Sequence, residues 1–346
     1  MNCDLIVPIL NINDLAHEAS ISNTQLLSVL NNEASTLDTD VVRRLLNVVR
    51  KYGLERQFYE LTNRIHTIGV FVPHQIGLDF VGNIAQAVTE TAAEYGYAVE
   101  YHVQRAFKPL QTDDFLDLIG NKGAIVIASD DARIIAQTCL IHNCPYVLIE
   151  NEFRENLSSG LEIVTNNRQA IQDAVNYLIG LGHQQFAYLT GNLDNQSMRD
   201  RLDGYQMTLR AAGIPYDRDW IIETNWRTEN GYEKSKRLFV GDHRPTAVLC
   251  GNDMIALGVM RAAGEAGLIV GQDVSVIGFD DLPAAAQSQP PLTTLQQPMR
   301  QMGEMAFVQL LNMMHGHMPY LRHLRVSAHL IVRGSTGPAP HVFLTH

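Results

Sequence analysis

The run Thr67-Ile-Gly-Val-Phe-Val72 decides the fold class that we expect for this chain. It is a continuous apolar stretch rich in β-branched residues, which is typical of a strand buried on both faces of a parallel sheet. A helix-like stretch follows it over 79–95 and ends at Gly96. The same alternation of strand and helix continues along the chain, and it predicts an α/β fold with parallel sheets.

The alternating elements form two similar series, the second of which begins near Ile163. We expect strands over 98–103, 124–128, 146–149, 185–190, 221–223, 247–250, 275–279 and 326–332, and helices over 113–119, 132–142, 168–181, 199–212, 228–238, 254–266 and 299–314. These series predict two doubly wound parallel-sheet lobes. We expect an N-lobe over about 67–162 and 293–325, a C-lobe over about 163–292 and 326–336, and a tail over 337–346.

Residues 1–52 have the pattern of three short helices. The first covers 14–19, Ser22 can cap a second over 23–30, and a third spans 38–52 before Gly53. Three short helices with a tight turn between the first two predict a small all-α helix-turn-helix domain. Short helical hairpins without a DNA-binding role show the same pattern, so the pattern alone is weakly specific.

Composition limits the functions open to the chain. It has 346 residues, with 26 Lys and Arg against 37 Asp and Glu, and a net charge of −11. An acidic protein does not attract nucleic acid by its mean charge, so DNA binding requires a small local surface.

Cysteine spacing and hydropathy argue against a metal-binding, redox, membrane or secreted protein. The cysteines, Cys3, Cys139, Cys144 and Cys250, lack the C-x2-C spacing of zinc and redox motifs, so we expect free thiols, no metal and no cofactor. No apolar run is long enough for a membrane helix, and the N-terminus lacks the features of a signal peptide. We therefore expect a soluble cytoplasmic protein.

Polar and aromatic side chains follow several of the expected strands. In a two-lobed α/β protein the ligand lies in the cleft between the lobes, at the carboxyl ends of the strands. The candidate ligand-binding residues at such positions are Asp79, Phe80, Asn151, Arg199, Trp226, Asn252 and Asp280. An arginine offers donors for vicinal oxygens, a carboxylate accepts bonds from hydroxyls, and an indole covers an apolar sugar face or a base.

Six longer motifs occur in a fixed order along the chain. They are Gly180-Leu-Gly-His183, Arg199-Asp-Arg-Leu-Asp-Gly-Tyr205, Arg244-Pro-Thr-Ala-Val-Leu-Cys-Gly-Asn-Asp-Met-Ile-Ala-Leu-Gly258, Asp273-Val-Ser-Val-Ile-Gly-Phe-Asp-Asp281, Pro291-Leu-Thr-Thr-Leu-Gln-Gln-Pro298 and Val332-Arg-Gly-Ser335. Together they resemble the lactose/galactose-repressor family of bacterial transcription regulators, over about residues 12–336.

This resemblance implies a domain organisation. It implies a DNA-binding head over 1–52, a hinge over 53–66, and a periplasmic-binding-protein-like core over 67–336 that dimerises and binds a small effector. The expected protein is an effector-responsive transcription regulator that acts as a repressor. Its expected partners are pseudo-palindromic operator DNA, an effector, and a second copy of the chain, with a tetramer as the alternative.

The resemblance also implies roles in the cleft. Arg199 would hold effector hydroxyls or a carboxylate, Asn252 and Asp280 would bind from the second lobe, and Trp226 would stack on the ligand. Structural alternatives stay open for each: Arg199 could pair with Asp203, Trp226 could be core, and Asn252 and Asp280 could be caps. Asp79 stands where the family usually has an aromatic residue, and it could contact a polar effector or be solvated.

For the head, the resemblance implies that the second helix enters the major groove. That helix begins at Ser22; Asn23, Thr24 and Ser28 would face bases, and Gln25 and Asn31 would face phosphates or backbone. Leu61 would be the leucine that wedges into the minor groove, displaced by about one position.

The head departs from the family pattern in two residue types and in charge. Ser28 replaces the family's usual arginine, and Ser20 replaces the usual glycine of the turn. Residues 1–66 carry six Arg and Lys against eight Asp and Glu, a net of −2. This balance predicts weak DNA binding with a modest salt dependence. Three interpretations remain: unusual operator contacts, a required partner, or a head that has lost DNA binding.

Two other functional classes compete. A solute-binding protein that serves a transporter would need export, and neither a signal peptide nor a lipid-attachment cysteine motif is evident. An enzyme on a doubly wound fold would need a motif such as G-x-S-x-G, a P-loop or H-E-x-x-H, and none of these occurs. We therefore expect a protein that is not an enzyme. A sugar or sugar derivative is the expected effector class, with a nucleoside or purine as the alternative.

Overall fold

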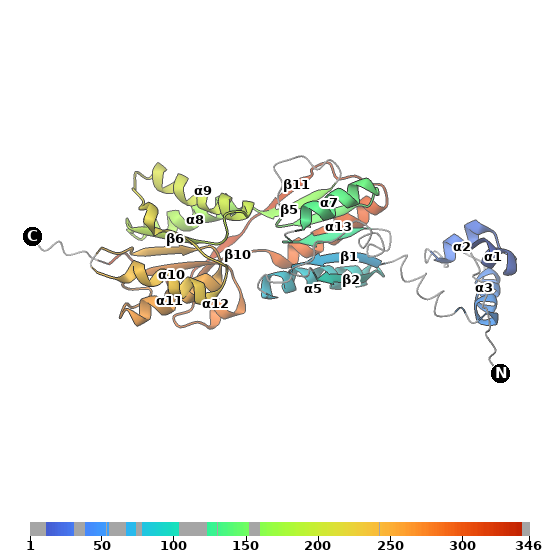
Figure 1. Ribbon diagram of the computed structural model, residues 1–346, viewed down its shortest axis with the longest axis horizontal. Coiled ribbons are helices and arrows are strands. Elements are labelled where there is room, and N and C mark those ends of the chain that lie inside the picture. The colour runs from blue at the N-terminus through green and yellow to red at the C-terminus, as the bar shows by residue number, and fades with distance from the viewer. Residues whose placement is uncertain are drawn as a thin grey trace, which may run out of the picture.

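The computed structural model describes residues 12–30, 39–52, 54, 67–73, 78–103, 123–129, 131–151, 160–241 and 243–340. The described residues form three parts, a helical head, an N-lobe and a C-lobe, and the chain passes between the two lobes more than once (Figure 1). Several expectations lie outside the described residues, namely the helix over 113–119, the stop at Gly53, and the DNA contacts of Asn31 and Leu61. The fold class is the expected one: two α/β lobes behind an all-α head.

The head consists of helices α1 (Ile12–Glu18), α2 (Asn23–Leu30) and α3 (Thr39–Lys51), close to the expected bounds. Their apolar faces meet in one small core, in which Leu26 and Leu45 are fully buried. The turn between α1 and α2 passes through Ser20, whose φ is +50°. Ser20 N–H donates to the carbonyl of His17 and Ile21 N–H to that of Ala16. This pair of bonds is a Schellman motif, in which glycine is the preferred residue at the position of Ser20.

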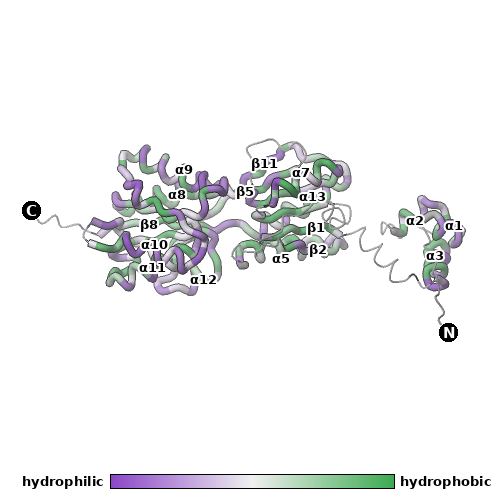
Figure 2. The backbone as a smooth tube through the Cα atoms, viewed as in Figure 1, coloured by the Kyte–Doolittle hydropathy of each residue, from purple (hydrophilic) through white to green (hydrophobic). Residues whose placement is uncertain are grey.

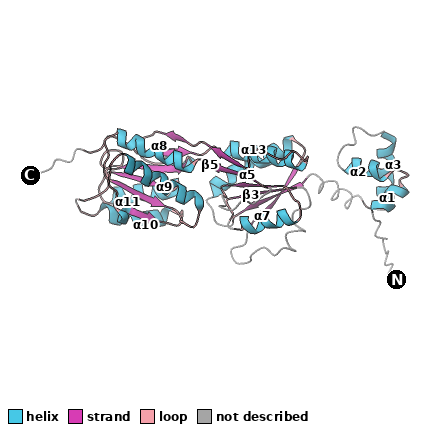
Figure 3. Ribbon diagram, turned by 90° about the horizontal axis from the view of Figure 1, so that it is seen from above, coloured by secondary structure: helices cyan, strands magenta, loops and turns pink. Residues whose placement is uncertain are grey.

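The N-lobe is a six-stranded, wholly parallel sheet in the order β11-β5-β4-β3-β1-β2. Its elements are β1 (Thr67–Val72), α5 (Leu78–Glu94), β2 (Ala98–Val103), β3 (Ala124–Ile127), α7 (Ala132–Ile141), β4 (Tyr146–Ile149), β5 (Leu161–Thr165), α13 (Met299–Met314) and β11 (His323–Val326). Helix α7 covers one face of the sheet, and α5 and α13 cover the other (Figure 3). The central strands are buried on both faces, which explains their continuous apolar runs.

The C-lobe is also a six-stranded sheet, in the order β12-β10-β9-β8-β6-β7, and it is parallel except for the edge strand β12, which is antiparallel to β10. Its elements are α8 (Asn167–Gly180), β6 (Phe186–Thr190), α9 (Gln196–Ala211), the 3-10 turn Arg218–Trp220, β7 (Ile221–Glu223), α10 (Thr228–Ser235), the 3-10 turn Lys236–Phe239, β8 (Ala247–Cys250), α11 (Asp253–Glu265), β9 (Ser275–Asp280), α12 (Pro283–Gln287), β10 (Thr293–Gln296) and β12 (His329–Ile331). Helices α8 and α9 lie on one face, and α10 and α11 lie on the other. Hydrophobic segments gather inside each lobe (Figure 2).

The points where the chain passes between the lobes differ from the expected boundaries. β5 pairs with β4, so residues 163–165 belong to the N-lobe sheet and not to the C-lobe. β10 pairs with β9, so residues 293–296 belong to the C-lobe. The single strand expected over 326–332 is two strands: β11 joins the N-lobe sheet and β12 the C-lobe sheet. Sheet membership is decided by hydrogen bonds to strands distant in sequence, which local hydropathy does not encode.

Candidate functional site

Five parallel strands of the C-lobe, β6 to β10, end toward the N-lobe, and residues with unusual backbone geometry gather there. Trp226 follows β7 with a φ of +70°, and Asp280 and Asp281 at the end of β9 have φ values of +123° and +62°. On the N-lobe side, Glu150 follows β4 with a φ of +53°. Such conformations cost non-glycine residues about 1–3 kcal/mol each and cluster at functional sites. The strained strand ends therefore mark the interlobe face as the candidate site.

The indole of Trp226 lies against the backbone of Gly191, which follows β6. A Cβ atom added at Gly191 would lie 2.7 Å from the Trp226 ring, so only glycine permits this contact. Asn252 holds the neighbouring segment: its Nδ2 donates to the Trp226 carbonyl at 3.2 Å, and its Oδ1 accepts from Ile255 N–H at 2.8 Å. Asn252 is thus the cap of α11 and also positions Trp226. The partly exposed indole leaves one surface available for stacking.

A buried arginine, Arg201, lies behind these residues with 3% of its surface exposed. Its Nε donates to Asn167 Oδ1 at 2.7 Å and its Nη1 to the Gly251 carbonyl at 2.6 Å. The guanidinium carbon lies 3.4 Å from the ring centre of Phe279, which is a cation–π contact. Burial lowers the pKa of Arg201, whereas the nearby charges of Asp280 and Glu150 raise it. An arginine keeps its charge in such surroundings, so it is the fixed cation of the site.

Buried carboxyl groups surround this cation. Burial, and then repulsion from Asp253, raise the pKa of Asp280 to about 8. Burial raises the pKa of Asp253 to about 7, against the hydrogen bonds that it accepts from Thr294 Oγ1 and Leu282 N–H. Two carboxyl groups that share one low-dielectric region repel each other when both are charged. The pair therefore holds a proton more strongly than isolated aspartates do.

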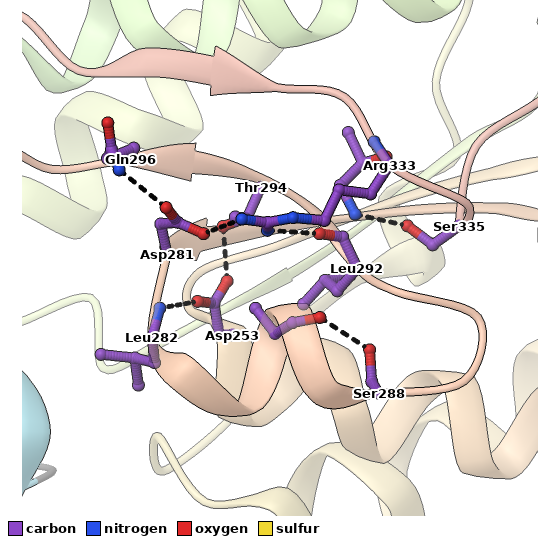
Figure 4. A network of polar contacts seen from close by, with 11 residues as sticks. Asp253, Asp281, Leu282, Ser288, Leu292, Thr294, Gln296, Arg333 and Ser335 are labelled. Atoms are coloured by element: carbon purple, nitrogen blue, oxygen red, sulfur yellow. Dashed lines mark hydrogen bonds and ion pairs between the residues drawn. The ribbon is translucent and has the colours of Figure 1, made fainter.

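Asp281 belongs to a structural network that also includes Asp253 (Figure 4). It accepts from Arg333 Nη2 at 2.6 Å and from Gln296 Nε2 at 2.8 Å, while Arg333 Nη1 donates to the Leu292 carbonyl. These bonds join the end of β9 to β10 and to the segment after β12. The network stabilises the strained backbone on which Asp280 lies.

Two hydrogen-bond chains cross from one lobe to the other. Ser197 Oγ, in α9 of the C-lobe, donates to Glu150 Oε2 at 2.9 Å. Thr165 Oγ1, at the end of β5 in the N-lobe, donates to Gln297 Oε1 at 2.6 Å. Gln297 Nε2 in turn donates to Asp280 Oδ1 at 2.5 Å. The cleft residues of the C-lobe are therefore connected directly to the strand ends of the N-lobe.

An open cavity of about 720 Å³ lies between the lobes beside this cluster. Its walls are Asn83, Gln86, Asp280, Asp281, Gln296, Gln297, Pro298, Met299, Arg300, Gln301 and Glu304. Of the residues expected in the cleft, only Asp280 lines it. We place the candidate site at the strained strand ends next to this cavity, because the buried charges and the partly exposed indole lie there.

Several of the expected ligand-binding residues are placed differently. Arg199 bonds to Gln196 Oε1 and to the carbonyls of Leu193 and Asp194, so it holds its own loop and does not pair with Asp203. Asn151 exchanges two bonds with the backbone of Ser129.

The two residues expected from α5 do not meet the cluster either. Phe80 is buried in the N-lobe core among apolar side chains, whereas Asp79 is exposed in the first turn of α5. The structure brings together Trp226, Asn252 and Asp280, but not the other four.

Arg201, Asp253, Glu150 and Gln297 were not among the candidate ligand-binding residues, although Arg201 and Asp253 lie in stretches expected to hold functional residues. Each is a neighbour of a residue or segment that was singled out: Arg201 lies two positions after Arg199, and Glu150 lies directly before Asn151. A helix turns by about 100° per residue, so Arg199 and Arg201 lie on nearly opposite sides of α9. The buried face of α9 also carries Tyr205 and Leu209, and that periodicity was the signal that could have favoured Arg201.

The head has one exposed helix face at the position expected for DNA contacts. On α2, Asn23 and Thr24 are exposed, Ser28 is half-buried, and Leu27 is 49% exposed. Ser22 and Gln25 cap the helix reciprocally: Gln25 N–H donates to Ser22 Oγ at 3.1 Å, and Ser22 N–H to Gln25 Oε1 at 2.9 Å. This is a capping box, so Ser22 has the role expected of it at the helix start.

The basic residues of α3 are largely engaged within the head. Arg44 Nη1 donates to the Ser20 carbonyl at 2.9 Å, Lys51 pairs with Glu18 at 3.3 Å, and Arg43 pairs with Asp40 at 2.7 Å. Three of the four basic residues of α3 therefore have partners within the head.

Within the described residues, none of the helices has the length and apolar character of a membrane span. In the same residues, no group of three or more His, Cys, Asp or Glu side chains is arranged to hold a metal ion.

A two-lobed core with a polar, charged interlobe face, preceded by a helix-turn-helix head, defines a ligand-binding transcription regulator. A family model described as a periplasmic binding protein-like domain matches residues 175–336. The transcriptional repressor CytR of Escherichia coli strain K12 is 34% identical over 284 residues, which covers 80% of this chain and 81% of that protein.

Solved structures agree with this class. A regulatory protein of the LacI family from Chloroflexus aggregans has a TM-score of 0.72 and 27% identity, covering 79% of this chain and 99% of that one. The lac repressor dimer bound to operator and the anti-inducer ONPF has a TM-score of 0.73 and 25% identity, covering 94% and 99%. The chain belongs to the LacI family of transcription regulators, which is not a family of enzymes.

Proposed function

We propose that this cytoplasmic protein is a repressor that binds operator DNA as a dimer through its head and a small effector between its lobes. The observation that carries the proposal is the link Thr165–Gln297–Asp280, which joins the two lobes at the strained strand ends. A ligand that bonds to Asp280 Oδ1 competes with Gln297, and so it changes the contact between the lobes. Such a differential contact is what a ligand needs to shift a conformational equilibrium.

The chemistry of the site favours a neutral ligand that carries hydroxyl groups. Arg201 supplies fixed donors, Asp280 and Asn252 can accept or donate, and Trp226 offers a half-buried aromatic face. Pyranose and furanose rings combine vicinal hydroxyls with an apolar face, which matches this set. We propose a sugar or sugar derivative, with a nucleoside as the second class because its base could stack on the same indole.

A second function, a ligand-binding protein that has lost DNA binding, is favoured by the charges of the head. Arg43, Arg44 and Lys51 are each engaged by acidic or carbonyl groups of the head itself. Phosphate neutralisation by such residues supplies most non-specific DNA affinity. The two functions differ only in whether the head binds DNA.

One paired experiment separates them. Full-length protein and a chain without residues 1–60 are screened by thermal shift against sugars and nucleosides, then tested for gel retardation of DNA from the protein's own promoter region. We expect a ligand to stabilise both proteins, and only the full-length chain to retard DNA in a ligand-dependent manner. Ligand binding without any DNA retardation supports the second function, and equal retardation by both chains refutes the role of the head.

A further inference from the structure

We propose that Cys139 and Cys144 form a redox-active dithiol that a peroxide oxidises to an intramolecular disulfide. The two residues lie at the end of α7 in the N-lobe, just before the start of β4, and so at the sheet edge opposite the candidate site. The inference rests on the geometry of this helix end and does not depend on the proposed function.

The end of α7 is a Schellman motif. Asn143 has a φ of +53°, its N–H donates to the Leu140 carbonyl at 3.3 Å, and Cys144 N–H donates to the Cys139 carbonyl at 2.8 Å. In this motif the side chains of the two residues joined by the bond that spans five positions contact each other across the helix end. Those residues are Cys139 and Cys144. The backbone therefore brings two thiols together although their spacing matches no C-x2-C motif.

The two thiols are chemically unequal. Cys139 is fully buried in the core beneath α7, whereas Cys144 is partly exposed. The hydrogen bond between the thiols raises the pKa of Cys139, as does its burial, and lowers the pKa of Cys144. Cys144 Sγ also lies 3.6 Å from the Pro145 carbonyl. An accessible thiol with a lowered pKa next to a second thiol is the arrangement found in redox-sensing cysteines.

The reaction with hydrogen peroxide balances in two steps. The Cys144 thiolate attacks one peroxide oxygen, the O–O bond breaks, and the products are a sulfenic acid and hydroxide, which the Cys139 proton neutralises to water. Cys139 sulfur then attacks the sulfenic sulfur, the S–O bond breaks, and the departing hydroxide takes up a solvent proton to become a second water. The two sulfurs lose two electrons in total, and the peroxide gains them. A thiol such as reduced glutathione reverses the disulfide.

The chain provides its own reference thiol. Cys250, in the C-lobe, is buried, and this burial raises its pKa. It has no second cysteine beside it among the described residues. Cys139 and Cys144 also fall in one tryptic peptide, between Arg133 and Arg154, whereas Cys250 falls in another. In a mass spectrum, a disulfide between Cys139 and Cys144 therefore lowers the mass of this one peptide by two hydrogens.

The test oxidises the full-length protein with hydrogen peroxide, alkylates the remaining thiols and maps the peptides by mass spectrometry. We expect the 134–154 peptide to lose two hydrogens and resist alkylation, to recover with dithiothreitol, and Cys250 to remain alkylatable. Cys144→Ser should abolish the mass loss. Alkylation of both cysteines after peroxide treatment, or conversion of Cys144 to a sulfinic acid without cross-linking, overturns the proposal.

A second pair of variants tests the geometry. Asn143→Gly keeps the left-handed conformation and should form the disulfide at the wild-type rate. Asn143→Val opposes that conformation and should slow disulfide formation about tenfold, because the two thiols no longer stay in contact. Equal rates in the two variants, with both proteins folded by circular dichroism, would show that the helix end does not bring the thiols together, and the proposal would be wrong.

Discussion

The side-chain amide of Gln297 donates to the buried carboxyl of Asp280 over 2.5 Å, while its oxygen accepts from Thr165 of the opposite lobe. Gln297 follows β10, where the chain leaves the C-lobe sheet for α13 of the N-lobe. One side chain at a crossover thus connects the candidate site to both lobes. Through this contact, a ligand bound at the site could change the arrangement of the lobes and with it the spacing of the two heads in a dimer.

Arg201, and not Arg199, is expected to determine effector affinity. Arg201→Lys keeps the positive charge near Asp280 and Glu150 but loses the forked donor geometry, so affinity for the screened ligand should fall about tenfold or more. Arg199→Lys is the matched control on the same helix, and it should alter affinity less than about twofold, because Arg199 bonds only to its own loop. Isothermal titration measures both. A larger loss in the Arg199 variant contradicts the assignment.

The stability of the core should fall as the pH rises through the neutral range. The folded-state pKa of Asp280 is about 8, against 3.8 for an ordinary aspartate, so between these values the folded state holds more protons than the unfolded chain. The free energy of unfolding therefore decreases with pH across that window.

Asp280→Asn tests this pH dependence. The substitution removes one titrating group and the repulsion on Asp253, so the unfolding temperature should depend less on pH. The exposed carboxyl of Asp203, changed to asparagine, is the control and should leave the wild-type slope. Thermal unfolding from about pH 5 to about pH 9 gives the slopes. Identical slopes for the wild-type protein and the Asp280 variant would contradict the raised pKa of Asp280.

Gly191→Ala should displace Trp226. The new methyl would lie 2.7 Å from the indole, so the ring must move, and ligand affinity should fall about tenfold with a change in tryptophan fluorescence. Gly264→Ala, in α11 with open space around the new methyl, is the control. It should leave affinity unchanged and stabilise the protein by up to about 1 kcal/mol. If both variants bind alike, Trp226 does not contact the ligand.

Substitutions of two serines in the head should change its stability in opposite directions. Ser20→Gly removes the cost of a left-handed serine and should stabilise the head by about 1 kcal/mol. Ser22→Ala removes one half of the capping box and should destabilise it by about 1 kcal/mol. Hydrogen exchange of the α1 and α2 amides in the full-length protein measures both changes. Faster exchange in the glycine variant would contradict the Schellman geometry of this turn.

Most of the fold followed from local patterns. The apolar runs of β1, β3, β4 and β8 and the glycine-terminated α5 lie within a residue or two of their expected bounds, because strands and helices impose periods that a sequence displays directly. The lobe boundaries did not follow, since β5, β10 and β11 are short and find their partners only in three dimensions.

The candidate site was predictable only in part. Trp226, Asn252 and Asp280 were found because they follow strands whose ends meet at one edge. Arg201 and Gln297 were not found, because a motif names the residues of a segment but not the direction in which each side chain points.

By itself, the sequence determined the α/β class, the helical head and its net negative charge, and membership of a repressor family, because all of these are properties of composition, period and ordered motifs. Only the tertiary structure decided which arginine lies among the buried carboxyl groups, which amide joins the lobes, and that two cysteines meet at the end of α7. These facts depend on side-chain direction and on contacts between residues far apart in the chain, and packing alone sets both.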